Sequence, residues 1–109
     1  MSSVSTAKVA NPHRGEVALE LDGTAHVLRP SFGALVAAEE ELGSLFQLIE
    51  RASGGELKLA ELVGLFWHCL AERGDTSREA FAEAVTNAGL AALAAPLRAL
   101  LVQVLKGGG

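Results

Sequence analysis

Apolar and polar residues alternate over residues 16–21 and again over residues 24–29, with Asp22 and Gly23 between the two runs. Alternation with a period of two is typical of a half-buried β-strand. An Asp-Gly pair accepts the positive φ values that a two-residue type I′ turn requires. The pattern therefore predicts a β-hairpin near the start of the chain.

The turn also predicts the register of this hairpin. Leu21 is expected opposite Thr24, and Glu16 opposite Arg29. The apolar face then carries Val17, Leu19, Leu21 and Leu28. The other face carries Glu16, Glu20 and Arg29, where the Glu16–Arg29 pair would contribute only a few tenths of a kcal/mol. Because two strands alone are marginal in water, we expect helices to cover the apolar face.

After the hairpin, apolar residues recur every three or four positions, which is the period of an amphipathic helix. The predicted helices span residues 32–42, 45–52, 58–73, 77–87 and 90–106. Gly74 is predicted to end the third helix, and Thr76 with Glu79 to form a capping box before the fourth. Pro96 removes a backbone donor, so the last helix is predicted to kink or restart there.

The first helix follows Pro30, which ends the second strand, with Ser31 as its N-cap. Its apolar stripe consists of Phe32, Leu35, Val36 and Leu42. We expect this stripe to lie on the apolar face of the hairpin. Glu39 falls within the stripe, and its carboxylate is expected to accept backbone hydrogen bonds or to pair with Arg29, because an unpaired buried charge is costly.

The third helix is apolar on two sides. Its core stripe is predicted to consist of Leu59, Leu62, Val63, Phe66 and Leu70. A second strip consists of Ala60, Gly64, Trp67 and Ala71, in which small residues surround one large aromatic. This strip has two interpretations, packing within the chain or contact with a partner protein.

Composition limits the fold and the class of partner. The chain has 109 residues, of which half are hydrophobic, and a net charge of −4. This length has room for one domain, and its Ala and Leu content favours helix. We predict a mainly α (α+β) fold over residues 15–106, with a flexible tail at residues 1–14 and disorder at 107–109. The scattered basic residues and the negative charge argue against nucleic-acid binding.

No chemical site emerges from the spacing of reactive residues. His68 and Cys69 are neighbours on a helix, so their side chains point about 100° apart and cannot form a nucleophile–base pair. Cys69 is expected to be a buried apolar residue. No zinc-ligand spacing or phosphate loop is present, so we expect no catalysis, metal or cofactor. With one cysteine, no signal peptide and no tract long enough to cross a bilayer, a cytoplasmic chain without membrane contact is expected.

The hairpin region also carries a family resemblance. Its residues are Gly15-Glu16-Val17, Leu21-Asp22-Gly23, Val27-Leu28-Arg29-Pro30-Ser31-Phe32, Ala34-Leu35, Glu39 and Leu42-Gly43. Together they resemble a phage-tail family of gene transfer agents and related alphaproteobacterial prophages, over residues 15 to about 105. Members are described as tail assembly chaperones, and also as tail tube proteins.

The resemblance implies a chaperone that binds the tape-measure protein before the tail tube polymerises around it. Several copies on one client imply a homo-oligomer, in the cytoplasm or in a phage-like particle. One alternative is a structural tail subunit, either tube or connector, that is retained in the particle. Another is a helical adaptor encoded by the host and unrelated to phage.

Overall fold

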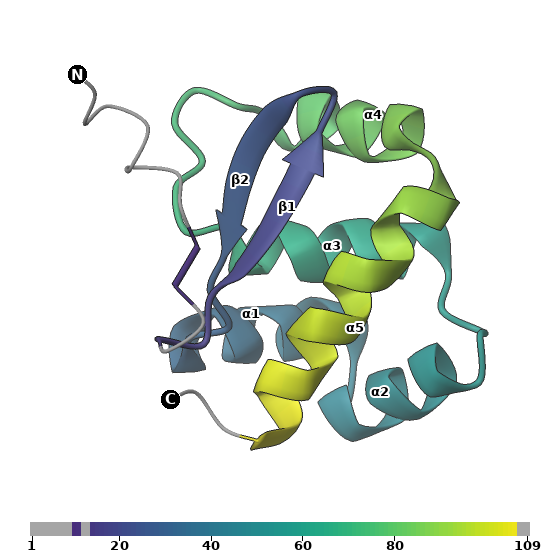
Figure 1. The fold of residues 1–109 in the computed structure, drawn as a ribbon. Coiled ribbons are helices and arrows are strands. Elements are labelled where there is room, and N and C mark those ends of the chain that lie inside the picture. The colour runs from purple at the N-terminus through teal and green to yellow at the C-terminus, as the bar shows by residue number, and fades with distance from the viewer. Residues whose placement is uncertain (1–9, 12–13, 107–109) are drawn as a thin grey trace.

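The computed structural model describes residues 10–11 and 14–106, where an antiparallel hairpin precedes five helices. The elements are β1 (Val17–Leu21), β2 (Thr24–Leu28), α1 (Phe32–Leu42), α2 (Leu45–Ser53), α3 (Leu59–Cys69), α4 (Arg78–Ala88) and α5 (Leu90–Lys106). Figure 1 shows the hairpin on one side of the molecule, with α4 across its turn end and α5 beside β1. The predicted fold class is confirmed. Most of the predicted N-terminal tail and all of residues 107–109 lie outside the described residues, so those boundaries stay predictions.

The hairpin has the predicted register and turn. Leu21 pairs with Thr24, and Val17 pairs with Leu28. Asp22 and Gly23 have φ values of 51° and 80°, as a type I′ turn requires at both central positions. The four aliphatic side chains of the apolar face are all buried. The predicted register and apolar face are therefore confirmed.

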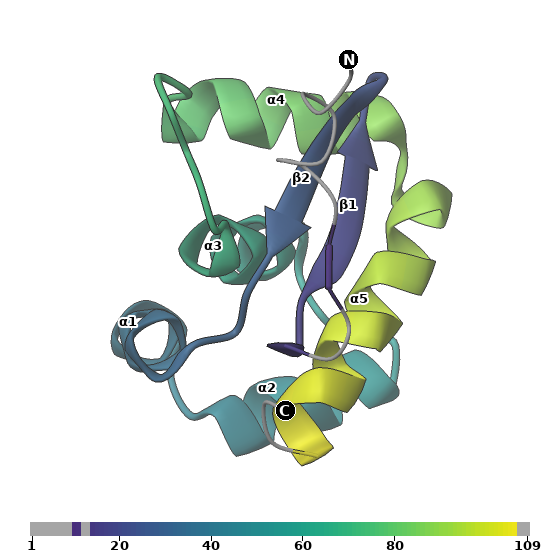
Figure 2. The ribbon, with the colours of Figure 1, turned by 60° about the vertical axis from the view of Figure 1, so that its left-hand side comes forward.

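The hairpin is not covered by α1, as the sequence predicted, but by other helices. α4 and α5 pack against β1, whereas α1 packs on α3 and α2, as Figure 2 shows. Phe32 is 85% exposed and Val36 36% exposed, so these two residues of the predicted stripe of α1 do not face the core. The other two, Leu35 and Leu42, pack against the core together with the buried Ala38. A Cβ atom on buried Gly64 would lie 3.2 Å from the Leu42 side chain, so the absence of one lets α1 approach α3 closely.

α3 ends at Cys69, before the predicted end at Arg73. The Cys69 carbonyl accepts a hydrogen bond from the Arg29 amide at 2.6 Å, and the Ala71 amide donates to the Val27 carbonyl at 2.9 Å. These backbone groups pair with the end of β2 and its continuation and so cannot extend the helix. The prediction was wrong because a pairing with a distant strand leaves no mark on local helix propensity.

Two further helix boundaries differ from the predictions. The Ser77 hydroxyl accepts a hydrogen bond from the Ala80 amide at 3.1 Å. Ser77 is therefore the N-cap of α4, and the predicted capping box of Thr76 with Glu79 is wrong. α5 runs unbroken through Pro96, so a restart there is wrong. A proline deletes one helical hydrogen bond, and burial of leucines on both sides of Pro96 stabilises the remaining helix.

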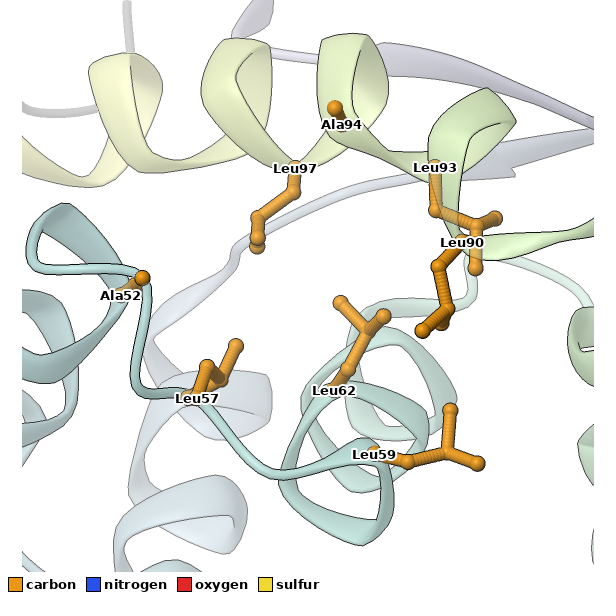
Figure 3. A pocket seen from close by; sticks show the side chains of 9 residues that line it. Ala52, Leu57, Leu59, Leu62, Leu90, Leu93, Ala94 and Leu97 are labelled. Atoms are coloured by element: carbon orange, nitrogen blue, oxygen red, sulfur yellow. The ribbon is translucent and has the colours of Figure 1, made fainter.

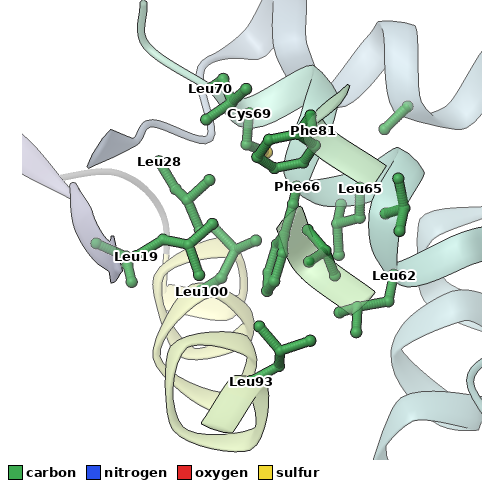
Figure 4. Close-up of a cluster of buried hydrophobic side chains, with 14 of the residues drawn as sticks. Leu19, Leu28, Leu62, Leu65, Phe66, Cys69, Leu70, Phe81, Leu93 and Leu100 are labelled. Atoms are coloured by element: carbon green, nitrogen blue, oxygen red, sulfur yellow. The ribbon is translucent and has the colours of Figure 1, made fainter. Parts of the chain in front are cut away.

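The hydrophobic core lies between the hairpin and the helices α3, α4 and α5 (Figure 4). Its largest fully buried side chains include Phe66, Phe81, Leu19, Leu28, Leu93 and Leu100. Cys69 is also buried, and burial raises the pKa of its thiol to about 12. The prediction that Cys69 is a buried apolar residue is confirmed.

Glu16 differs from its predicted place on the solvent face of the hairpin. Its side chain is only 6% exposed. The carboxylate accepts hydrogen bonds from the Arg29 guanidinium at 2.6 and 2.9 Å and from the Asn11 amide at 2.9 Å. These bonds, that of Arg29 first, lower the pKa of Glu16. The predicted pairing with Arg29 exists. It is part of a partly buried network that also binds the chain before β1 through the Asn11 amide.

Candidate partner-binding site

An open apolar groove lies between α5, the start of α3 and the loop that follows α2 (Figure 3). Its volume is about 220 Å³. Six leucines form most of its walls: Leu57, Leu59, Leu62, Leu90, Leu93 and Leu97. In Figure 3 the leucines of α5 point toward Leu57 and Leu62 on the opposite wall. Below, these residues are called the leucine groove.

The helical spacing of the leucines produces this groove. Leu90, Leu93 and Leu97 share one face of α5 at intervals of three and four residues. Leu93 is 1% exposed and forms part of the floor, whereas Leu90 at the rim is 62% exposed. Leu59 on the α3 wall is 42% exposed. The rim therefore presents apolar surface to solvent.

The lining of the leucine groove determines which ligands it can bind. All of its lining residues are Leu, Ala or Gly, so no side chain in it can donate or accept a hydrogen bond. Its volume is below the roughly 300–1,000 Å³ of small-molecule sites. A groove of this kind suits the apolar side chains of another polypeptide, as in helix-in-groove recognition.

Other large apolar side chains are exposed away from the leucine groove. Among the described residues they are Phe32, Val36, Phe46, Val102 and Leu105. Phe32 and Phe46 are 85% and 80% exposed. Phe32 and Val36 lie one helical turn apart on the outward side of α1. This outward side is a second apolar surface.

The strip that the sequence singled out for a partner is largely in contact with its own chain. Gly64 is buried beside Leu42, and Trp67 is half-buried with its ring 5.7 Å from that of Phe81. Ala71 is half-buried and Ala60 is exposed. Of the two interpretations of this strip, the contacts of Gly64 and Trp67 correspond to packing within the chain.

Glu39, expected in the apolar stripe, has an exposed side chain. Its carboxylate accepts a hydrogen bond from the Leu45 amide at 3.2 Å. A backbone amide was one of the two kinds of partner predicted for it. The other predicted partner, Arg29, binds Glu16 instead. Ser31 caps α1 directly after Pro30, as predicted, through a hydrogen bond from the Ala34 amide.

An ionic cluster that the sequence pattern does not indicate joins the three helices α1, α3 and α4. The Glu41 carboxylate lies 2.7 Å from Nε2 of His68 on α3 and accepts hydrogen bonds from Arg78 on α4 at 2.5 and 2.9 Å. The hydrogen bond from Arg78, and then that from His68, lowers the pKa of Glu41 to about 2. Glu41 itself lies at the surface, with its side chain 39% exposed. No local spacing signals this cluster, because the partners are 27 and 37 residues away.

Because of Glu41, the stability of the fold should depend on pH in the acidic range. Its pKa is lowered in the folded state, so its contribution is complete above the ordinary value of 4.5 and is lost as the pH falls toward 2. We expect the difference in unfolding free energy between the wild type and Glu41→Gln to shrink as the pH falls over that window. Denaturant titrations across this range measure it. A difference that stays the same into strong acid would show that the ion pairs contribute nothing.

Within the part of the chain that the structure describes, no group of three or more His, Cys, Asp or Glu side chains could hold a metal ion. None of the described helices is by itself both long and apolar enough to span a membrane. α4 and α5 taken together pass that test of length and composition, with a bend of 112° between them.

The comparisons with known proteins agree with the resemblance seen in the hairpin. A family model described as "Phage tail tube protein, GTA-gp10" matches residues 14–107. No curated protein and no solved structure matches the chain. Because the match covers nearly the whole sequence, the chain belongs to this phage tail family of gene transfer agents.

Proposed function

We propose that this chain is a tail assembly chaperone that binds an apolar helix of the tape-measure protein in its leucine groove. Membership of a phage tail family implies contact with other tail proteins. The observation that carries the proposal is the leucine groove, with Leu59 and Leu90 exposed at its rim. Its role is to hold a polypeptide rather than to catalyse a reaction.

Burial of apolar surface at the leucine groove would drive binding of the client. Each Å² of apolar surface removed from water contributes about 25 cal/mol. A client helix that inserts aliphatic side chains between the leucines of α3 and α5 buries surface on both proteins. The net charge of −4 favours solubility of the complex. The chain can therefore shield an apolar client without being large.

The alternative, a structural subunit of the tail, fits the description of the family. A ring-forming tube subunit needs two different surfaces that meet head to tail. The two proposals differ in where the protein ends up. Quantification in purified particles and in the lysate separates them, because a tube subunit is present at high copy number and a chaperone is left behind. A host adaptor unrelated to phage does not fit the family match.

A charge at the rim of the leucine groove is expected to prevent binding of the client. Leu90→Glu places a charge at the rim, and because Leu90 is 62% exposed the fold should tolerate it. We expect the variant to lose most of the tape-measure protein that co-purifies with the tagged wild type. The matched control is Phe32→Glu, which adds the same charge at an exposed apolar residue outside the groove. Equal recovery of the tape-measure protein with both variants would contradict the groove as the client site.

A further inference from the structure

The charged residues around the leucine groove are in excess on the positive side. These charged residues are direct sequence neighbours of residues that line the groove. Two of them, Arg51 and Glu61, form an ion pair with an N–O distance of 2.5 Å. The others are Glu56, Lys58 and Arg98. The charge of Lys58 interacts with Glu61, whereas Arg98 has no hydrogen-bond or ion-pair partner among the described residues. The groove thus combines an apolar floor with an excess of one positive charge beside it, although the whole chain is acidic.

α5 contributes to the excess of positive charge beside the groove. Its 17 residues include no Asp or Glu. Arg98 lies one helical turn beyond Ala94, which lines the groove, so it continues the wall of the groove on the same side of the helix. A ligand that complements this wall is apolar with a negative flank.

The outward side of α1 has that character. It presents Phe32 at 85% exposure and Val36 at 36%, and Glu40 follows on the same row one turn later. Glu39 is exposed beside it. α1 has no Lys or Arg. Apolar residues followed by carboxylates, on a helix without cations, match a leucine groove flanked by cations.

We propose that the outward side of α1 from one copy of this chain docks in the leucine groove of a second copy. Phe32 and Val36 enter between the leucines, and Glu40 lies near Lys58 or Arg98. In this contact one copy contributes the outward side of α1 and the other contributes its leucine groove. The association is therefore head to tail. This contact stands independently of the proposed function. One consequence does rest on that function, namely that a client helix and a second copy compete for the groove.

The head-to-tail arrangement gives a decisive mixing experiment on the purified full chain. We expect the wild type to self-associate with rising concentration in sedimentation velocity. Phe32→Glu alone and Leu90→Glu alone should each be monomeric, because each lacks one of the two surfaces. An equimolar mixture should form one-to-one dimers, because the first variant keeps its groove and the second keeps its α1 side.

Three outcomes would overturn the proposal. They are a wild type that stays monomeric at every concentration, a mixture that stays monomeric, and single variants that associate as the wild type does. Circular dichroism establishes that each variant is folded. None of these outcomes touches the proposed function, which is tested with the tape-measure protein present.

The charge match is tested separately. Glu40→Lys should weaken self-association on the order of tenfold, because it replaces an attraction by a repulsion at the rim. Glu20→Lys is the matched control, since it changes the net charge equally on the exposed face of β1. Equal weakening by both would show that net charge alone governs the contact and would refute the docking of α1.

Discussion

Replacing Phe81 with alanine is expected to lower the free energy of unfolding by about 3–5 kcal/mol. Phe81 is 1% exposed, and its ring lies 5.7 Å from the ring of Trp67 on α3 and 6.1 Å from that of His26 on β2. It therefore joins the hairpin, α3 and α4 in one cluster. Removing the ring loses apolar burial and leaves a cavity that the surrounding backbone cannot close.

Equilibrium denaturation in urea measures this loss. The control is Phe46→Ala, the same chemical change at a side chain that is 80% exposed, and we expect it to stay within about 0.5 kcal/mol of the wild type. Similar losses from both substitutions would mean that the packing around Phe81 is not the core of the fold.

The second large effect is expected at Glu16. Replacing it with alanine should cost about 2 kcal/mol, because it removes a buried acceptor of three hydrogen bonds and leaves the Asn11 amide without its bond. Arg29 is 49% exposed and can regain water, so the cost stays below that of an abandoned buried charge.

Chemical denaturation of Glu16→Ala beside Glu20→Ala tests this expectation. Glu20 is exposed on the same strand, and its removal should change the unfolding free energy by less than about 0.5 kcal/mol. If the two variants were equally stable, the network of Glu16 with Arg29 and Asn11 would be an ordinary surface pair.

Local signals were sufficient for much of the fold. The alternating strands and the Asp22-Gly23 turn determine the hairpin and its register, because turn geometry and side-chain period constrain each other. Ser31 after Pro30 and the glycine after Leu42 predict the observed bounds of α1. Each of these features depends on residues that are close in the sequence.

Features that depend on distant residues could not be predicted in this way. The position of α1 depends on the contact of Gly64 with Leu42, and the end of α3 on pairing with the end of β2. The same limit applies to the site. Leucines recur at helical spacing along α5, but only the structure shows that α3 leaves part of this leucine stripe, including Leu90, open to solvent.

The proposed function requires the leucine groove to be the binding site of a tail client. It is tested most directly by placing a photo-crosslinking amino acid at position 90 in cells that are assembling tails, with position 46 as the exposed control site. We expect an adduct with the tape-measure protein from position 90 and little from position 46. Tape-measure adducts from position 46 alone, or from neither position, would contradict it.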